Sequence, residues 1–235
     1  MGPRREEVLA LVPYRRVVAD IGAGDGQLSV ELVLRRQARQ VIATERVEGP
    51  LRVVEASVKR AGLAHCIEVR LGDGLAPLKP KEAEVVVMAG IGALTIREIL
   101  KAQPQEVAFF EALVLQPLND PGPLRRWLWE EGLGTSYETL VEENGRQYPV
   151  MLVQPGVPSA PLWEGLGELN FELGIYLLKT GHHGLDTVLK RMERQCAQVL
   201  SDLENPAAPP RPRRYWQERK RKLKEARALW QQHAP

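Results

Sequence analysis

Three acidic residues stand where short apolar stretches of the sequence end. Asp20 closes VVADIG, Glu45 closes QVIATE, and Asp73 follows CIEVRL. Apolar runs of this length that end in glycine or an acid are typical of buried strands. Carboxylates at the ends of neighbouring parallel strands can accept hydrogen bonds from ribose hydroxyls or from an amino group. The pattern therefore predicts a nucleoside-like ligand at one edge of a sheet. The alternative for each acid alone is a helix N-cap or a turn.

A glycine-rich turn follows the first of these acids. The segment reads Asp20-Ile-Gly22-Ala-Gly24-Asp-Gly26, and Glu45 comes 19 residues after Gly26. Glycines let the backbone approach a ligand closely, and a following helix N-terminus favours negative charge. Because an acid precedes the first glycine, the order resembles that of S-adenosylmethionine-dependent methyltransferases more than that of NAD-dependent enzymes. In that arrangement, Asp20 lies near the amino-acid part of the cofactor, Glu45 holds the ribose and Asp73 the adenine.

The fourth apolar stretch ends in MAGIGA, where methyltransferases place the group to be methylated. It lacks the [DNS]-PP-[YFW] motif, which argues against methylation of an exocyclic amine. A ring nitrogen such as adenine N1 already has an in-plane lone pair, so it needs positioning more than deprotonation. We therefore expect the target-base pocket at Ile91 and Gly92. The alternative is that Gly90 and Gly92 only form a tight turn.

Strand-like and helix-like segments alternate over the first two thirds of the chain. This order predicts an α/β fold with a mostly parallel, doubly wound, Rossmann-like sheet. Two strand-like runs around Glu-Asn-Gly at 143–145 predict an antiparallel hairpin at the sheet edge. The expected strands cover 17–22, 40–45, 66–73, 83–92 and 111–117, and the expected helices cover 27–36, 48–62, 94–103 and 122–132.

The C-terminal part has a different character. A Pro-rich joint at 156–163 precedes a mainly helical region at 164–203 and a basic helix at 215–233. We expect a helical hairpin resembling a coiled coil, and domains of 1–156 and 157–235. From Arg211 onward there are nine Lys and Arg against two Glu, although the whole chain has a net charge of +2. A basic tail fits contact with an anionic polymer, and the alternative is a solvated helix.

The remaining composition excludes several classes. Of the 235 residues, 44% are hydrophobic and 26% are charged, as in soluble globular proteins. The longest apolar run, at 85–94, is too short to span a membrane, and the first residues do not resemble a secretory signal. Two cysteines without CxxC spacing indicate neither a disulfide framework nor a metal site, so we expect a cytoplasmic protein without a metal. The pair His182 and His183, in TGHHG, marks a helix interruption more readily than a metal site.

Several stretches together resemble the bacterial TrmK family of tRNA adenine-N1 methyltransferases, which act at tRNA position 22. The most diagnostic are VEGP (47–50), RLGDGL (70–75), the MAG-x-G strand end, LQP (115–117) and the Glu-x-Gly-Arg-x-Tyr stretch (143–148). The resemblance covers most of residues 4–156. It implies S-adenosylmethionine as cofactor and tRNA as partner. With the acids and glycines above, it gives the expected cofactor contacts Asp20, Gly22, Ala23, Gly24, Gly26, Glu45, Arg46, Asp73, Gly74, Met88, Ala89 and Gly90.

The chain departs from the family where cofactor and target base should meet. The family usually reads DIGSDHAYLP and MAGMGG, where this chain reads DIGAGDGQLS and MAGIGA. A different RNA or small-molecule target, or a catalytically silent RNA-binding protein, therefore stays open. Asp25 is the candidate carboxylate for stabilising a cationic methylated base, and a solvated turn residue is the alternative.

Recognition of tRNA is assigned to the basic helix. Tyr215, Trp216 and Trp230 accompany its charges, but Trp216, Leu223 and Trp230 recur every seven residues, which favours the seam of the hairpin. A monomer is favoured, without a sequence feature that decides it. The predicted phosphate contacts are Arg213, Arg214, Arg219, Lys220, Arg221, Lys222 and Lys224.

Overall fold

The computed structural model describes residues 2–204 and 213–234. The chain divides into two compact units, Met1–Ser159 and Ala160–Pro235. Most of the Pro-rich spacer expected between the last two helices, and Arg211 with it, lies outside the described residues.

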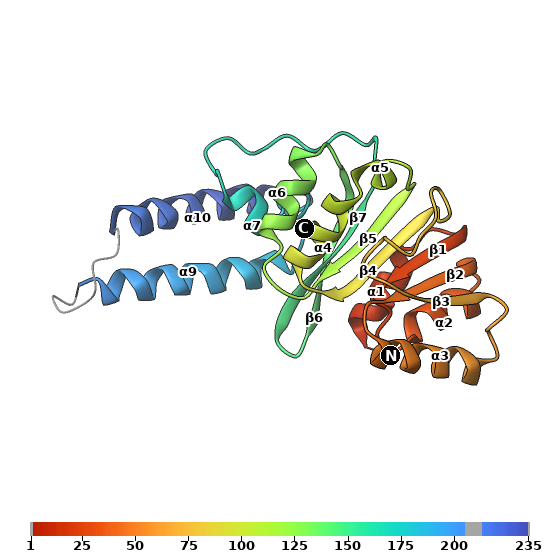
Figure 1. The fold of residues 1–235 in the computed structure, drawn as a ribbon. Helices are drawn as coiled ribbons and strands as arrows, with labels where there is room; N and C mark the ends of the chain where they lie inside the picture. Colours follow the sequence, from red (N-terminus) through yellow and green to blue (C-terminus); the bar gives the residue numbers. More distant parts are fainter. Residues whose placement is uncertain (1, 205–212, 235) are drawn as a thin grey trace. The chain divides into compact units, whose positions relative to one another are not determined.

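A seven-stranded sheet forms the centre of the first unit (Figure 1). Its order is β3-β2-β1-β4-β5-β7-β6; the first five strands of the chain run parallel, and β7 runs antiparallel to β5 and β6. The β6–β7 turn has φ of 52° at Asn144 and 72° at Gly145, as the favoured two-residue hairpin turn requires. The predicted mostly parallel sheet with a closing hairpin is confirmed. The strands are β1 (Arg15–Ile21), β2 (Ala38–Glu45), β3 (Ile67–Leu71), β4 (Val85–Ile91), β5 (Ala112–Pro117), β6 (Thr135–Glu143) and β7 (Arg146–Val153).

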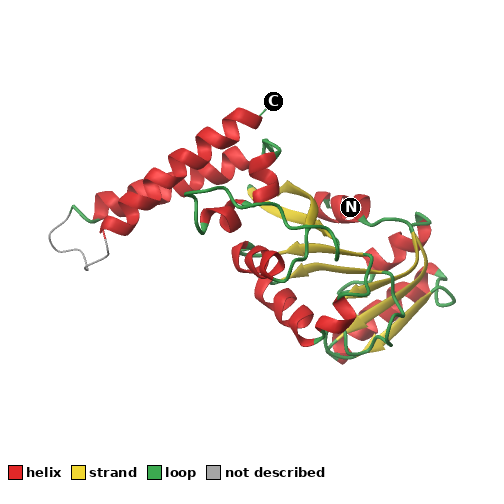
Figure 2. Ribbon diagram, turned by 90° about the horizontal axis from the view of Figure 1, so that it is seen from above, coloured by secondary structure: helices red, strands yellow, loops and turns green. Residues whose placement is uncertain are grey.

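Helices cover both faces of this sheet (Figure 2). Side chains alternate along a strand, so Val85 and Val87 pack with α1, α2 and α3, whereas Val86 and Met88 pack with α4 and α6. All four side chains are fully buried, which explains why this strand reads as a continuous apolar run. The helices are α1 (Pro3–Leu11), α2 (Gln27–Leu34), α3 (Glu48–Ala61), α4 (Ala93–Ala102), α5 (Pro104–Val107) and α6 (Gly122–Glu130).

The second unit consists of helices α7 (Leu169–Leu173), α8 (Ile175–Lys179), α9 (Leu185–Asp202) and α10 (Arg213–His233). The helical region expected at 164–203 is therefore interrupted at Gly174, and also at TGHHG, where an interruption was predicted. Gly174 has a φ of 91° and Gly181 a φ of 62°, and a β-carbon on Gly181 would lie 2.0 Å from the carbonyl oxygen of His233. Neither position can continue a helix with an ordinary residue.

Helices α9 and α10 pair side by side in opposite directions. The Cys196 thiol donates to the Trp216 carbonyl over 3.3 Å near one end, and the Trp230 indole donates to the His182 carbonyl over 3.0 Å near the other. Leu223 is fully buried between these two points. The seven-residue spacing thus marks the hairpin seam, as predicted. Within the described ranges, no helix is both long enough and apolar enough to span a membrane.

Candidate active site

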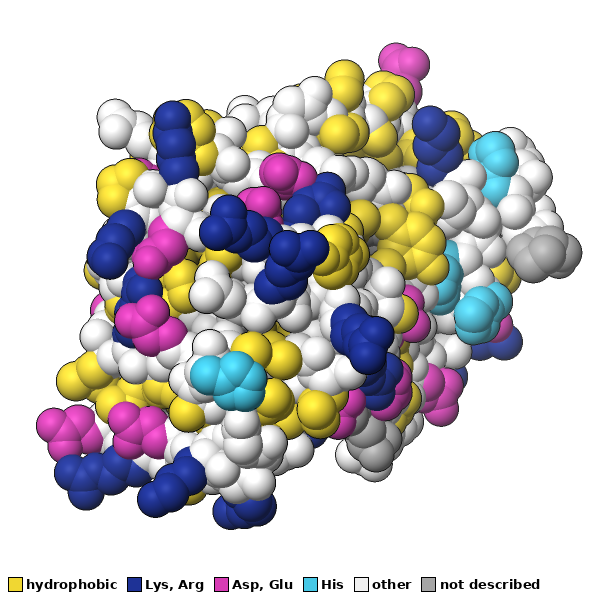
Figure 3. Space-filling model, turned by 90° about the vertical axis from the view of Figure 1, so that its right-hand side faces the viewer, with side chains coloured by type: hydrophobic (Ala, Val, Ile, Leu, Met, Phe, Trp, Pro, Cys, Tyr) yellow, Lys and Arg dark blue, Asp and Glu magenta, His cyan; other side chains and the backbone are white. Residues whose placement is uncertain are grey.

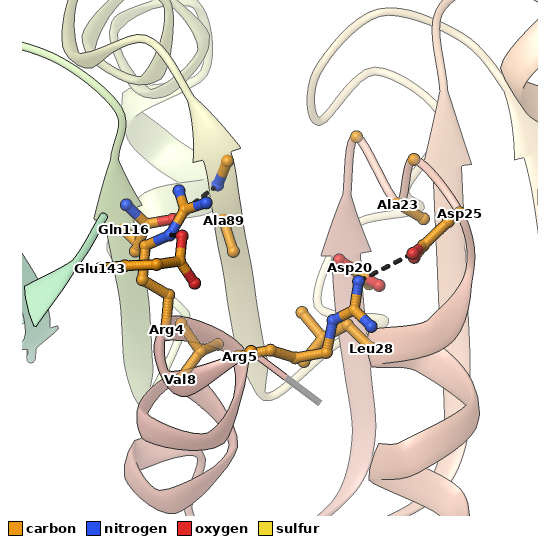
Figure 4. A pocket seen from close by; sticks show the side chains of 14 residues that line it. Arg4, Arg5, Val8, Asp20, Ala23, Asp25, Leu28, Ala89, Gln116 and Glu143 are labelled. Atoms are coloured by element: carbon orange, nitrogen blue, oxygen red, sulfur yellow. Dashed lines mark hydrogen bonds and ion pairs between the residues drawn. The ribbon is translucent and has the colours of Figure 1, made fainter. Parts of the chain in front are cut away.

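A crevice of about 490 Å³ opens at the carboxyl ends of β1 and β4. The strand order reverses here, because β2 lies on one side of β1 and β4 on the other. Open α/β sheets bind ligands at such a switch point, and the volume is within the range of small-molecule sites. Segments around β1 supply one side, β4, β5 and β6 supply the other, and α1 lies between them (Figure 4).

The predicted glycine turn forms the wall next to β1. Gly22, Gly24 and Gly26 all have φ between 61° and 71°, a conformation that glycine adopts readily. A β-carbon on Gly26 would lie 3.1 Å from the Cα of Val54, so this residue also lets α3 pack closely. Of the expected cofactor contacts in this turn, Gly22, Ala23 and Gly24 line the crevice, whereas Gly26 is not among the described lining residues.

Asp20 places a desolvated carboxylate in the crevice. The residue is 2% exposed, and its Oδ2 accepts a hydrogen bond from the Ser29 hydroxyl at 2.6 Å. Burial raises the pKa of Asp20 to about 6, and the Ser29 hydrogen bond opposes part of that rise. Burial removes the water that stabilises an ionised carboxylate, and the Ser29 hydroxyl is a neutral donor. A positively charged ligand group would stabilise the ionised form of Asp20, so the site favours a cationic ligand.

The other two acids lie at the adjacent strand ends but not in the crevice itself. Glu45 Oε1 accepts a hydrogen bond from the Gly24 amide at 2.6 Å, and the Glu45 carbonyl accepts one from Gly72, next to Asp73. The β3-β2-β1 order therefore brings all three acidic positions to one edge of the sheet. The described residues that line the crevice do not include Glu45, Arg46, Asp73 or Gly74. Gly74 instead packs on α4, where a β-carbon would lie 2.8 Å from an Ile99 methyl group.

The end of β4 contributes backbone to the crevice. Ala89 and Gly90 line it, and the Gly90 amide donates to Gln116 Oε1 over 3.1 Å. The Met88 side chain is fully buried in the core, so only its main chain is available for the predicted cofactor contact.

The two residues predicted for the target-base pocket are outside the described lining. A β-carbon on Gly22 would lie 3.0 Å from the Ile91 side chain, so Ile91 packs against the glycine turn. Gly92 precedes α4, whose first amide, on Ala93, donates to Asn119 Oδ1 over 2.8 Å.

Charged side chains from distant segments complete the crevice. Arg5 of α1 forms an ion pair of 2.8 Å with Asp25, whose side chain is 54% exposed. Arg4 of α1 forms an ion pair of 2.5 Å with Glu143 at the end of β6. Asp25 therefore lies at the rim, and its other carboxylate oxygen accepts a hydrogen bond from the Gln27 amide.

Sequence reasoning missed seven of the described lining residues. Four of them are polar or charged, namely Arg4, Arg5, Gln116 and Glu143, and the other three are Gly2, Val8 and Leu28. Gln116 belongs to LQP and Glu143 to the Glu-x-Gly-Arg-x-Tyr stretch, both diagnostic in sequence but without a role. No local pattern places α1 over the crevice, because its contacts depend on the tertiary fold. The sequence did contain a signal for Gln116 and Glu143, because LQP and the Glu-x-Gly-Arg-x-Tyr stretch both lie at the ends of predicted strands.

Most of the predicted phosphate-binding cations have partners within the second unit. Arg219 forms a bidentate pair with Glu172, Arg221 pairs with Glu218 and Glu225, and Lys222 lies 3.9 Å from Glu218. Arg213 lies 3.9 Å from Glu204. Within the described ranges, no carboxylate lies within 4.0 Å of the charged groups of Arg214, Lys220 or Lys224, which leaves these as the stronger candidates.

The two adjacent histidines lie in the break between α8 and α9. The rings of His182 and His183 stack with centroids 4.7 Å apart, and His182 Nδ1 accepts a hydrogen bond from the Gly184 amide. Among the described residues, no group of three or more His, Cys, Asp or Glu could hold a metal ion.

On the face drawn in Figure 3, basic and acidic side chains are interspersed.

Comparison with known proteins agrees with this geometry. Residues 1–151 match the family described as "Methyltransferase domain". The tRNA (adenine(22)-N(1))-methyltransferase of Bacillus subtilis is 34% identical over 156 residues, which are 66% of each chain. Two solved structures match nearly the whole fold. Streptococcus pneumoniae Sp1610 in complex with S-adenosyl-L-methionine has a TM-score of 0.83 at 28% identity, covering 96% of this chain and 99% of that one. The B. subtilis m1A22 tRNA methyltransferase TrmK has a TM-score of 0.82 at 26% identity, covering 100% and 99%.

The sheet order and the crevice at its switch point define a Rossmann-like methyltransferase. The chain belongs to the methyltransferase-domain family, and within it the chain is homologous to the B. subtilis tRNA (adenine(22)-N(1))-methyltransferase TrmK.

The crevice fits S-adenosylmethionine as cofactor. Asp20 lines it with a desolvated carboxylate, which would suit a cationic amino group, and Gly22 and Gly24 line it without side chains. Glu45 is the last residue of β2, and Asp73 follows the end of β3 by two residues.

Proposed function

We propose that this protein transfers a methyl group from S-adenosylmethionine to N1 of an adenine in tRNA, at position 22 as in its B. subtilis relative. One observation carries the proposal: a desolvated Asp20 and the glycine turn face a crevice at the switch point, in a chain homologous to TrmK. The alignment with the curated relative spans about two thirds of each protein, whereas the TrmK structure is matched over its whole length.

Three acidic residues of the first unit bind different parts of the cofactor. Asp20 holds the amino group of the cofactor, Glu45 the ribose and Asp73 the adenine, and the bound cofactor supplies an electrophilic methyl group. Glu45 also fixes the turn, through its hydrogen bond to Gly24. The target needs positioning beside Gly90 more than a base for deprotonation, because N1 presents a lone pair. This agrees with the absence of an amine-binding motif in MAGIGA.

The target adenine must leave its stack to reach the crevice. Extruding a base from RNA costs a few kcal/mol. The basic second unit supplies binding energy to offset this cost, through Arg214, Lys220 and Lys224 to phosphates and through Tyr215, which is 53% exposed. We accordingly assign methyl transfer to residues 1–156 and tRNA contact to residues 157–235, in a cytoplasmic protein.

The deciding experiment has two stages. Calorimetry first measures binding of S-adenosylmethionine, and the protein then methylates bulk tRNA from a strain that lacks the modification, followed by mass analysis of the nucleosides. We expect 1-methyladenosine among the nucleosides, and mass analysis of RNase fragments should place it at position 22. Another methylated nucleoside would assign a different RNA target. Cofactor binding without methylated RNA would favour a silent RNA-binding protein or a small-molecule substrate.

A further inference from the structure

Two sequence stretches that had no role meet on one side of the crevice. Gln116 comes from LQP at the end of β5, and Glu143 comes from the Glu-x-Gly-Arg-x-Tyr stretch at the end of β6. Figure 4 shows them grouped with Ala89 and Arg4, opposite Asp20, Ala23, Asp25 and Leu28. Asp20 and the glycine turn, which we assign to the cofactor, occupy that opposite side, whereas Ala89 and Gly90, also expected cofactor contacts, lie on the side with Glu143. We therefore assign the part of this side around Glu143 to the target base.

Glu143 forms an ion pair with Arg4 at this wall. Its Oε2 accepts from Arg4 Nε at 2.5 Å, and the two side chains are 18% and 28% exposed. The Arg4 guanidinium also lies over the Tyr148 ring, 4.4 Å from its centroid, so the last residue of the same stretch holds the arginine in place. A carboxylate has more acceptor positions than one guanidinium contact uses, so Glu143 can accept a further hydrogen bond.

We propose that Glu143 is the base-facing carboxylate: it accepts a hydrogen bond from the N6 amino group of the target adenine and stabilises the positive charge of the product. Arg4 is its positioning residue. This inference rests on the proposed function. It also gives a reason for base choice, because guanine would present an acceptor oxygen to the carboxylate instead of an amino group.

The charge balance of the reaction explains why such a group matters. The N1 lone pair forms the new N–CH₃ bond while the CH₃–S⁺ bond breaks, so sulfur becomes neutral and the adenine ring becomes cationic. No proton has to leave. The new charge is shared between N1 and N6, so an N6–H···Glu143 hydrogen bond strengthens as the reaction proceeds. Interactions that strengthen in the transition state are those that raise the rate.

Asp25 is less suited to this role. Both of its oxygens already accept hydrogen bonds, from Arg5 and from the Gln27 amide, and it lies on the cofactor side. Glu143 Oε1, by contrast, faces the α-carbon of Gly2: a β-carbon there would lie 3.0 Å from this oxygen. A residue without a side chain thus lies next to the carboxylate, at the lining of the crevice.

The test compares Glu143→Gln with Glu142→Gln, its exposed neighbour on the same strand. Single-turnover methylation is measured on two tRNA transcripts, one with adenine and one with purine, which lacks the N6 amino group, at position 22. We expect Glu143→Gln to slow transfer to adenine on the order of 10²-fold, but transfer to purine less than about threefold. Glu142→Gln should change neither rate. Glu143→Asp, which keeps the charge, serves the same comparison if the Gln variant does not fold.

Two binding measurements separate this role from a structural one. Calorimetry should give the same affinity for S-adenosylmethionine in wild type and Glu143→Gln within about twofold. Filter binding should show that the variant loses about tenfold affinity for the transcript carrying 1-methyladenosine, relative to unmodified transcript.

The outcomes distinguish this inference from the proposed function. Equal loss on adenine and purine, or a loss of cofactor affinity as large as the loss of rate, overturns the role of Glu143 alone. A wild-type protein that binds the cofactor but methylates no adenine overturns the proposed function, and the inference with it.

Discussion

The two sides of the crevice are built in different ways. The β1 side comes mainly from one short segment, Asp20 to Leu28, in which an acid and glycines follow a strand. The opposite side combines the ends of β4, β5 and β6, whose lining residues Gly90, Gln116 and Glu143 are far apart in sequence. The side built from one continuous segment can be recognised in the sequence as a motif. The side built from three separate strand ends appears in the sequence only as isolated polar residues.

The charges on the two sides differ as well. Asp20 is desolvated and has one neutral hydrogen-bond donor, so its pKa rises to about 6. Glu143 is partly exposed and pairs with the Arg4 guanidinium. The first arrangement favours a ligand that brings its own positive charge. The second is already balanced, and it suits a neutral base that gains charge only during the reaction.

Breaking the Asp20 side should have the largest effect on cofactor binding. Asp20→Asn removes the negative charge that we assign to the amino group of the cofactor. Because hydrogen bonds to charged groups contribute about 1.5–3 kcal/mol, we expect S-adenosylmethionine affinity to fall about 10- to 100-fold by calorimetry. Glu55→Gln, an exposed acid on α3, is the matched control and should leave the affinity unchanged. Unchanged affinity in Asp20→Asn would remove Asp20 from the cofactor site.

The pH dependence tests the same residue without relying on one variant. Since the pKa of Asp20 is raised to about 6, the ionised form that binds a cation is lost as the pH falls below about 6. Wild-type affinity should then fall up to about tenfold per pH unit, and Asp20→Asn should not follow this trend. The ligand-free protein should show the opposite sign: between about pH 4 and pH 6 its free energy of unfolding decreases as the pH rises, relative to Asp20→Asn.

Changing Gln116 should affect the opposite wall. The buried amide accepts from Gly90 and donates to the Pro117 carbonyl, so Gln116→Ala leaves the Gly90 turn without its support. We expect methyl transfer to slow about tenfold through misplacement of the base, with cofactor affinity within about threefold. Gln147→Ala, on β7 outside the crevice lining, is the control. Equal losses in rate and cofactor affinity would show that the two walls are not separate in function.

The sequence predicted the parallel sheet, the closing hairpin and the glycine turn because each depends on local pattern. Burial on both faces makes β4 a continuous apolar run, and Asp20, Gly22 and Gly24 lie within five consecutive residues. The role of Glu143 was not predicted, because it depends on α1 bringing Arg4 to the end of β6. The helix interruption at TGHHG was predicted from the sequence, whereas the break at Gly174 was not. The approach of His233 to Gly181 depends on the tertiary fold and has no local signal.

Removing cations from the second unit should lower tRNA affinity by a smaller amount, in proportion to the number of charges removed. Lys220→Ala with Lys224→Ala removes two cations without a nearby carboxylate among the described residues. We expect tRNA affinity to fall about threefold to fivefold per charge, and the slope of log affinity against log salt to decrease by about 2. Arg221→Ala with Lys222→Ala is matched in charge but starts from side chains near Glu218, so its effect should be smaller. Equal effects would mean that the intramolecular pairs do not select the phosphate contacts.

We expect the smallest effect on turnover for Asp25→Asn. This variant tests whether Asp25 or Glu143 is the carboxylate that stabilises the cationic base. Asparagine keeps an oxygen for the Gln27 amide and loses only the charge opposite Arg5. An ion pair this exposed contributes little, because solvent screens it, so turnover should change less than about threefold and cofactor affinity not at all. A large loss of turnover at constant cofactor affinity would return the charge-stabilising role to Asp25. The base would then meet its carboxylate on the cofactor side, and Glu143 would serve only to hold α1 to the sheet.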